Sequence, residues 1–433
     1  MDLLGKFGAR GTENVCICDF KDTGRGLAAA KEFKLHQEIL SIPTRICWSS
    51  QTANNHSVIG PILKSLDLSK DDSLAIMLMY YKIMSLGFIN SDGTELDELR
   101  LFHMSMIPTT YANSILLEPA DMQYCEGSSL FAATQILKQQ VQDDFQYICN
   151  NVIKVYPQLF NPQHFSLDLV DIVNLVYLGI VHYLECMVPF MDLFNGAVEV
   201  EQCHLYNLQT DAIQVIAGKE YKKGQQVFIN YGKIANNRLL RLYGFALDSN
   251  PNDEYELVLS TNIGSPNFVE KVMLLKQNNL DSTVNIPMTI QDPLPTAILQ
   301  YLRIQRASEE ELEMIETAMK PVTIRNELEI TNALIEALLL VLAGYRYKSG
   351  ELENLIHTLK APARYAAIVS LGEQRILLKS LQQAQIHYNC LNCQLCNTKQ
   401  LGNKKCGKCL LVAYCSRECQ VADWKTHKVK CKQ

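Results

Sequence analysis

Hydrophobic positions in the first half of the chain change from strand-like to helical spacing. Residues 12–47 alternate turns with short apolar runs, and the run at 39–43 follows Gly24-Arg25-Gly26. From about residue 60 to 185, apolar residues recur every three or four positions, as at Leu74, Met77, Leu78 and Tyr81. Ile136, Leu137, Val141 and Phe145 continue this pattern. The spacing predicts a strand region followed by a helical region.

The second half repeats that order. Strand-like runs return over residues 186–262, where 227–231 ends at a glycine turn and 255–259 follows an Asn-Pro-Asn-Asp loop. Helices dominate from about residue 267 to 385, with individual helices predicted at 310–319 and 326–345. A further helix at 380–387 is expected to run into the last segment. The pattern therefore predicts an α+β chain in which strand and helical regions are segregated.

The last forty residues carry eight metal-ligand side chains at regular spacing. They are Cys393, Cys396, Cys406, Cys409, Cys415, Cys419, His427 and Cys431. Two CxxC pairs, a Cx3C and an Hx3C supply seven thiolates and one imidazole, which complete two tetrahedral zinc shells. We expect an interleaved arrangement, with one ion on Cys393, Cys396, Cys415 and Cys419 and the other on Cys406, Cys409, His427 and Cys431.

This segment is too short to bury a core of its own, so metal binding must supply most of its folding free energy. The spacing, together with Tyr414 and Trp424, closely resembles a MYND zinc finger. A disulfide-stapled module is the alternative. It is disfavoured by the CxxC-plus-His pattern and by an N-terminus that does not look like a secretory signal. Cys390 lies outside the pattern and is interpreted as a spare thiol.

Length and composition narrow the class of protein. The 433 residues allow two or three domains, and a hydrophobic content of 48% is ordinary for a folded protein. No run reaches the roughly 18 apolar residues of a membrane helix, and the most apolar segment, 333–345, contains Glu336 and is interpreted as a buried helix. Seven of the fifteen cysteines are scattered before residue 390, as in a reduced intracellular protein. We therefore expect a cytoplasmic or nuclear protein.

Charge is unevenly divided along the chain. From Cys390 onward, nine Lys or Arg oppose Glu418 and Asp423, a net charge of +7, whereas the upstream residues carry −13. A basic finger could touch nucleic acid or an acidic partner, but these lysines could equally just solvate a small metal domain. The finger lacks the long base-reading helix of a groove reader, so nucleic acid is the least favoured partner.

Residues 224–245, which include Tyr231, Tyr243 and Phe245, resemble the end of a SET domain. The branch it resembles contains the Rubisco large-subunit methyltransferases and their animal relatives that act on protein lysine or histidine. Residues 22–27 match the family's N-terminal glycine motif, and 188–195 match its Val-Pro-x-x-Asp-x-x-Asn segment. Residues 321–327 and 372–377 look like its C-terminal helical substrate-binding domain.

The resemblance implies three domains. Residues 1–262 would form a SET β-fold with a helical insertion at about 46–185. Residues 263–388 would form an all-α substrate-binding-like domain, and residues 390–433 the zinc-stabilised MYND finger.

The resemblance also implies an S-adenosylmethionine-dependent protein methyltransferase, most simply a lysine N-methyltransferase that also binds two Zn2+. Tyr231 would be the catalytic tyrosine, with Tyr243 and Phe245 lining the substrate channel, where aromatic faces favour a cationic amine. The implied cofactor contacts are Gly24, Arg25, Gly26, Asp192, Asn195, Gly196, Tyr231, Tyr243 and Phe245. A free lysine must lose a proton before it attacks, which costs about 4.6 kcal/mol at pH 7.

Two positions depart from the family. Most relatives carry Asn-His where this chain has Asn195-Gly196, so ring packing beside the cofactor would be lost. An arginine that grips the cofactor's carboxylate is replaced at about Gly179-Ile180, with only His182 nearby. Losing one charge-assisted hydrogen bond costs about 1.5–3 kcal/mol.

These departures keep a second hypothesis open, in which the SET fold is a catalytically weak or inactive scaffold. The finger and the helical domain would then bind protein partners, since MYND fingers in relatives commonly dock proline-rich or other short peptide segments. The isolated histidines, among them His103, form no ligand spacing, and the Cys203-His204 pair is interpreted as structural. The identity of the substrate and the choice of lysine or histidine stay open.

Overall fold

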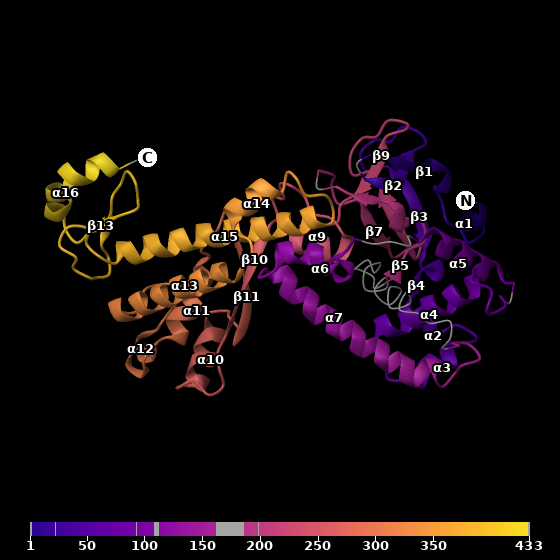
Figure 1. Cartoon of the computed structure of the whole chain (residues 1–433), viewed down its shortest axis with the longest axis horizontal. Coiled ribbons are helices and arrows are strands. Elements are labelled where there is room, and N and C mark those ends of the chain that lie inside the picture. The colour runs from indigo at the N-terminus through magenta and orange to yellow at the C-terminus, as the bar shows by residue number, and fades with distance from the viewer. Residues whose placement is uncertain are drawn as a thin grey trace. The chain divides into compact units, whose positions relative to one another are not determined.

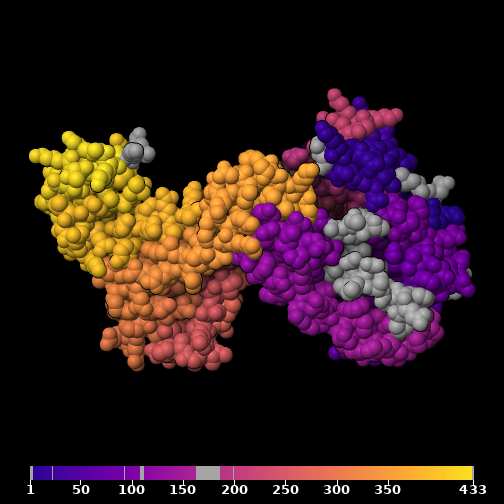
Figure 2. Space-filling view, in the orientation of Figure 1, coloured from indigo at the N-terminus to yellow at the C-terminus, as the bar shows by residue number. Residues whose placement is uncertain are grey.

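The computed structural model describes residues 2–21, 23–91, 93–107, 112–161, 186–197 and 199–431 (Figure 1; Figure 2). The chain divides into two compact units, which are described separately. The first contains Met1–Leu116, Ala133–Ile234 and Arg241–Gly244. The second contains Leu117–Ala132, Ala235–Leu240 and Phe245–Gln433.

Short strands in the described part of the first unit form three sheets, with strand orders β1-β2-β9-β6, β3-β8-β7 and β4-β5. Leu27, Leu40 and Val227 lie in the shared hydrophobic core. All neighbouring strands are antiparallel except β6 and β9, which are parallel. The bounds are β1 Val15–Phe20, β2 Gly24–Ala29, β3 Glu38–Pro43, β4 Trp48–Ser49, β5 Cys186–Met187, β6 Asn195–Gly196, β7 His204–Asn207, β8 Ala212–Ile216 and β9 Gln226–Ile229.

Helices of the first unit pack around a second core that includes Trp48, Met77 and Tyr81. A capping box between Ser69 and Asp72 starts α4, whose apolar residues are buried on all sides. The helical spacing predicted here is confirmed by α4 and α7. The helices are α1 Asp2–Lys6, α2 Ser50–Asn54, α3 Gly60–Lys64, α4 Lys70–Ser85, α5 Glu95–Met106 and α7 Ser129–Ile148, whose first turn belongs to the second unit. Short 3-10 or π turns occur at Thr12–Asn14, Thr44–Ile46, Ser114–Leu116, Cys149–Ile153 and Met191–Leu193.

The second unit is mainly helical, and Figure 1 shows α13 and α15 side by side. Tyr345 and His387 mark the two ends of this pairing, because they bond to Glu373 and Glu327. The long helix α15 leads into the finger, as predicted. The elements are α6 Pro119–Met122, the turn Gln123–Cys125, α9 Asn236–Tyr243, whose last turn with Tyr243 belongs to the first unit, β10 Glu254–Ser260, α10 Phe268–Gln277, β11 Thr283–Thr289, α11 Thr296–Gln305, α12 Glu309–Met314, α13 Ile324–Gly344, α14 Ser349–Leu355, α15 Ala363–Cys390, β12 Lys404–Lys405, β13 Ala413–Tyr414 and α16 Arg417–Lys430.

Two predictions for this unit were wrong in detail. The strand β11 lies within the region predicted as helical, because Ile286 and Met288 alternate with exposed residues and bury against the core while the strand pairs with β10. Pro287 obscured that period in the sequence. The helix predicted at 310–319 ends at Met314, since Ile315 turns to an extended conformation and packs into the core.

The apolar helix α13 is buried on one face only. Ile330, Leu334 and Leu338 lie in the core, whereas Leu340 is 76% exposed. The interpretation of residues 333–345 as a buried helix is therefore correct for one face of the helix only. By length and composition alone, the segment Ile324–Leu355 would suffice to cross a membrane, and 28% of its most apolar window is buried in the structure.

Glu311 should make the second unit sensitive to acid. Its carboxylate accepts hydrogen bonds from Arg325, Thr323 and the backbone of Ser308. Burial alone would raise the pKa, but these donors lower the pKa of Glu311 to about 2, from an ordinary value near 4.5. A depressed folded-state pKa gives stability that is complete above the unfolded value and lost as pH falls toward 2.

We therefore expect Glu311→Gln to lower the unfolding free energy by about 2 kcal/mol at pH 7. The difference from the wild type should shrink as pH falls below 4.5. Denaturant unfolding of both proteins at pH 7 and pH 3 measures this. An unchanged difference at the two pH values would show that the carboxylate's ionisation does not contribute.

Candidate active site and metal centre

The four-stranded sheet gathers the candidate cofactor residues of the first unit. Its strand β9 pairs with β2 through Leu27 and Ala28 and with β6 through Asn195 and Gly196. The glycine motif, the Asn-Gly pair and the end of the β9 segment are therefore neighbours, although they lie up to 200 residues apart in the sequence. Tyr231 follows two residues after β9 ends and so reaches the same place.

Gly26 and Asn195 are in close contact. The Asn195 side chain donates to the backbone carbonyl of Arg25 at 3.1 Å and to that of Thr23 at 3.4 Å. A Cβ atom on Gly26 would lie 2.7 Å from Asn195 Nδ2 and 2.6 Å from Gln226 Nε2, closer than side chains tolerate. Glycine at position 26 thus allows β2 to approach both amides.

Gln226 is a candidate that the sequence interpretation missed. Its Oε1 accepts a hydrogen bond from Thr23 at 2.9 Å, while its Nε2 is buried and has no hydrogen-bond partner among the described residues. An unsatisfied buried donor is costly, so this amide beside the glycine motif suits a polar ligand. The available signal was a polar residue at the start of an otherwise apolar strand.

Tyr231 is held by its hydroxyl and by its ring. The hydroxyl donates to the backbone carbonyl of Phe194 at 3.0 Å, next to Asn195. Its ring stacks on Tyr243, with centroids 4.2 Å apart and planes 12° apart. Burial, followed by the nearby Tyr243 and Asp192, raises the pKa of Tyr231 well above its ordinary value. The phenol is therefore neutral and a hydrogen-bond donor at physiological pH.

Gly196 contacts the Tyr231 ring. A Cβ atom at position 196 would lie only 2.3 Å and 2.4 Å from Tyr231 Cδ2 and Cε2. This chain has Asn195-Gly196 where the resemblance leads us to expect Asn-His. The Tyr231 ring occupies the space beside Gly196, so the change does more than remove a histidine ring. Glycine at position 196 is required for this position of the tyrosine.

We expect Gly196→Ala to displace the Tyr231 ring and break its hydrogen bond to Phe194. Since a rigid ring cannot yield locally, we expect kcat/KM for methyl transfer to fall by at least about tenfold. The control is Gly264→Ala, where the added Cβ would meet its nearest neighbour at 3.6 Å. Equal activity of the two variants would contradict the assigned role of Gly196.

Asp192 is positioned by a buried histidine. His103 Nε2 lies 2.9 Å from Asp192 Oδ2, and Trp48 Nε1 donates to His103 Nδ1 at 2.7 Å. Because Nδ1 accepts, Nε2 carries the proton and donates to the carboxylate. His103 therefore has a structural role, which its sequence position did not indicate, and it links the helical insertion to the Asp192 segment. Phe190, which precedes this segment, has a φ of 75°, which is uncommon for a bulky residue.

The remaining predicted cofactor residues have different surroundings. Gly24 has a φ of 68° and open space beside it. Arg25 donates to the carbonyl of Met106 at 2.5 Å. Phe245 belongs to the second unit, whereas Tyr231 and Tyr243 belong to the first. The positions at 179–182, where the family's arginine is expected, lie outside the described residues.

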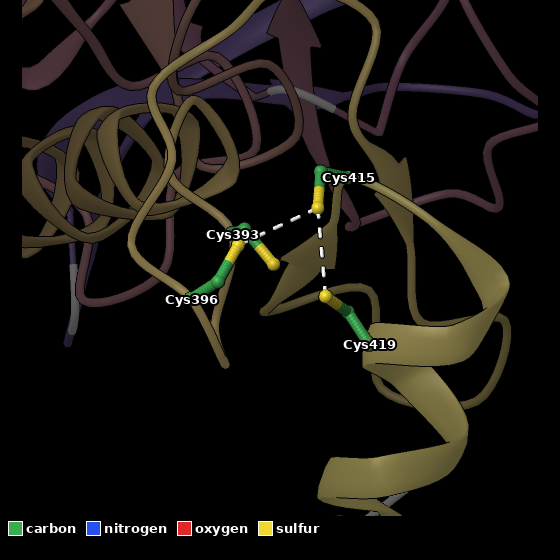
Figure 3. Close-up of side chains that lie close together, drawn as sticks. All are labelled: Cys393, Cys396, Cys415 and Cys419. Atoms are coloured by element: carbon green, nitrogen blue, oxygen red, sulfur yellow. Dashed lines mark hydrogen bonds between the residues drawn. The ribbon is translucent and has the colours of Figure 1, made fainter.

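The finger brings its eight predicted ligand side chains together in two sets. One contains Cys393, Cys396, Cys415 and Cys419, and the other Cys406, Cys409, His427 and Cys431. Within each set, all ligand atoms lie within 4.8 Å of one another. Figure 3 shows the first set, in which the Cys415 sulfur lies 3.5 Å from that of Cys396 and 3.6 Å from that of Cys419. The interleaved arrangement expected from the spacing is the one observed.

The chemistry of both sets fits zinc. A tetrahedral ion with Zn–S bonds of about 2.3 Å needs sulfurs about 3.8 Å apart, close to the observed separations. Burial raises the pKa of Cys393, but the backbone N–H groups of Cys396 and Cys415 lower it to about 6. The backbone N–H of Cys409 is the main cause that lowers the pKa of Cys406 to about 6. Each set thus contains a thiol that ionises readily, whereas neighbouring thiols raise the pKa of Cys415 to about 12 and burial raises that of Cys431 to about 11, so metal binding must displace protons from these ligands.

A polar cavity of about 1120 Å³ lies elsewhere in the first unit. Its lining includes Arg45, His56, Asp97 and Arg100. It does not include Tyr231 or Asn195. The cavity therefore does not mark the candidate active site.

Comparisons with known proteins bear on the fold and on the two C-terminal segments. The sequence model described as Rubisco LSMT substrate-binding matches residues 264–377, and the MYND finger model matches 393–431. The chain is 24% identical to a Rubisco large subunit N-methyltransferase of Nicotiana tabacum, covering 82% of this chain and 74% of that one. It is 23% identical to the actin-histidine N-methyltransferase of Gallus gallus, covering 86% and 66%.

A solved structure of the SET domain of LSMT, bound to lysine and AdoHcy, superimposes with a TM-score of 0.76. The two sequences are 20% identical, and the match covers 90% of this chain and 91% of the other. The chain therefore has the fold of the SET-domain LSMT structure, its residues 264–377 match the Rubisco LSMT substrate-binding model, and its residues 393–431 match the MYND finger model.

Proposed function

We propose that this protein is an S-adenosylmethionine-dependent protein methyltransferase. The observation that carries the proposal is the anchored Tyr231 hydroxyl, held at the Phe194 carbonyl beside Asn195 and the glycine motif. S-adenosylmethionine, when bound, supplies the methyl group from its sulfonium. The Gln226 amide, which is unpaired among the described residues and lies beside Gly26, suits a polar ligand at this place.

The chain's own residues contribute binding, orientation and a suitable electrostatic environment. Gly26, Asn195 and Gln226 would hold the cofactor from one side. The neutral Tyr231 hydroxyl would orient the reacting groups and polarise them. It would do so without adding a fixed charge beside the amine. The stacked rings of Tyr231 and Tyr243 form an apolar aromatic wall that would limit water beside the acceptor. Exclusion of water also lowers the pKa of an acceptor lysine and so favours the neutral, attacking amine.

Lysine is the proposed acceptor, supported by the LSMT structure bound to lysine. Histidine is the second candidate, because the chicken relative is an actin-histidine enzyme. Wild-type protein should transfer labelled methyl groups from S-adenosylmethionine to proteins of a cell extract. Acid hydrolysis and chromatography of the product distinguish methyl-lysine from methyl-histidine. A label found only on methyl-histidine would reject lysine and keep the methyltransferase proposal.

For the finger, we propose that it binds two Zn2+ and a short peptide segment, such as a proline-rich one, of a partner or substrate protein. The two sets of four ligands and the exposed side chain of Trp424 support this assignment. Because the ligand thiols must stay reduced, we also propose a cytoplasmic or nuclear location.

The alternative is an adapter that uses the SET fold without catalysis. Gly196 favours it, because relatives carry histidine there, whereas the ordered Tyr231 hydroxyl disfavours it. The adapter predicts partner binding with no incorporation of label into any extract protein. Incorporation that disappears with Tyr231→Phe would reject the adapter.

A further inference from the structure

The β1 strand presents two thiols on one face. Cys16 and Cys18 are two residues apart, so their side chains point to the same side of the strand. Their sulfurs are 3.8 Å apart. We propose that Cys16 and Cys18 form a binding site for a thiophilic divalent metal ion, separate from the finger and beside the glycine motif.

The sulfur separation suits a metal ion. Two Zn–S bonds of about 2.3 Å at a tetrahedral angle place the sulfurs about 3.8 Å apart. In the finger, the separations are 3.5 Å, 3.6 Å and, for Cys406 with Cys431, 3.8 Å. A disulfide would instead need sulfurs about 2.05 Å apart. As the side chains stand, the separation of the two sulfurs therefore fits two ligands of one metal ion and is too long for a disulfide bond.

Packing does not explain why these positions are cysteine. Free cysteine is among the most buried residue types, and Cys47, Cys125, Cys186 and Cys203 follow that rule here. Cys16 is exposed and Cys18 is half-buried. A solvent-facing pair of thiols gains little from burial, so metal binding accounts for the pair better than core packing does.

Metal binding by Cys16 and Cys18 requires no oxidant or reductant. Each thiol loses its proton and its sulfur donates an electron pair to the ion, so one ion bound releases up to two protons. Metal affinity should therefore increase with pH. Water completes the coordination shell.

The pair lies next to the candidate cofactor site. In the β1–β2 register, Cys18 is opposite Gly26 and Cys16 is opposite Ala28. Residues that pair directly across two strands lie on the same face of the sheet. A Cβ atom added to Gly26 would lie on that face and would approach Asn195 Nδ2. This part of the proposal rests on the proposed function. A metal ion bound at Cys16 and Cys18 would restrict and crowd the glycine motif and Asn195, and it would therefore inhibit methyl transfer.

Native mass spectrometry of full-length, zinc-loaded protein tests the site, with micromolar free Zn2+ as the probe. We compare the wild type, the double variant Cys16→Ser/Cys18→Ser and the control Cys149→Ser, which removes a lone half-buried thiol. The wild type and the control should carry one zinc ion more than the double variant. Either single serine variant should weaken binding of that ion by at least about tenfold. Thermal melting checks that all variants are folded.

Equal zinc counts in the wild type and the folded double variant would overturn the proposal. A second readout is methyl transfer, which added Zn2+ should inhibit in the wild type but not in the double variant. If the wild type transfers no methyl groups at all, the proposed function fails, yet the zinc counts still decide whether the Cys16–Cys18 site exists.

Discussion

Replacing Tyr231 by phenylalanine is expected to lower the rate of methyl transfer at saturating S-adenosylmethionine by at least about 100-fold. The variant keeps the ring stacked on Tyr243 and removes only the hydroxyl that donates to the Phe194 carbonyl. The loss should therefore appear in kcat, while cofactor affinity changes by less than about threefold. Initial rates of label incorporation and calorimetric titration with the cofactor measure the two quantities.

Tyr206→Phe is the matched control for this substitution. Tyr206 also donates its hydroxyl, to Asp211 at 2.8 Å, but it lies on β7, outside the candidate site. Its loss should leave methyl transfer unchanged. Full activity of Tyr231→Phe would remove the phenol from the mechanism and leave the fold assignment intact.

Replacing Cys406 by serine is expected to unfold the finger. Cys406 belongs to the second ligand set, with its sulfur 3.4 Å from His427 Nε2 and 3.8 Å from the Cys431 sulfur. Structural zinc supplies about 10–16 kcal/mol in small metal domains, far more than so short a segment gains from burial. We expect the zinc content to fall from two ions to one or none and residues 390–433 to become sensitive to protease.

Cys390→Ser is the control, because Cys390 is buried but belongs to neither ligand set. That variant should keep two zinc ions and a protected finger. The main melting transition should move little in Cys406→Ser. A fall of tens of degrees in that transition would show that the finger is integral to the rest of the second unit.

The metal-ligand sets could be predicted from the sequence because their ligands lie within forty residues and their spacing is characteristic. The candidate active site could be predicted only as a list of residues. Its contacts depend on β9 pairing with two strands distant in sequence, which spacing does not encode. For that reason the roles of Gln226 and His103 appeared only in the structure.

Gly196 shows most clearly why sequence comparison was insufficient. As a departure from the family, it indicated a missing ring beside the cofactor. In the structure, the absence of a side chain there is what lets the Tyr231 ring pack against the strand. A comparison of residue types cannot show which neighbour fills the space that a smaller residue leaves.

Calorimetric titration of the zinc-loaded protein with S-adenosylmethionine tests the central claim most directly. That claim is that the site formed by Tyr231, Asn195 and the glycine motif binds this cofactor. The account predicts one binding site per chain with a micromolar dissociation constant, weakened in Gly26→Ala, whose added Cβ would collide with Asn195 and Gln226. An absence of binding heat up to millimolar cofactor would contradict it.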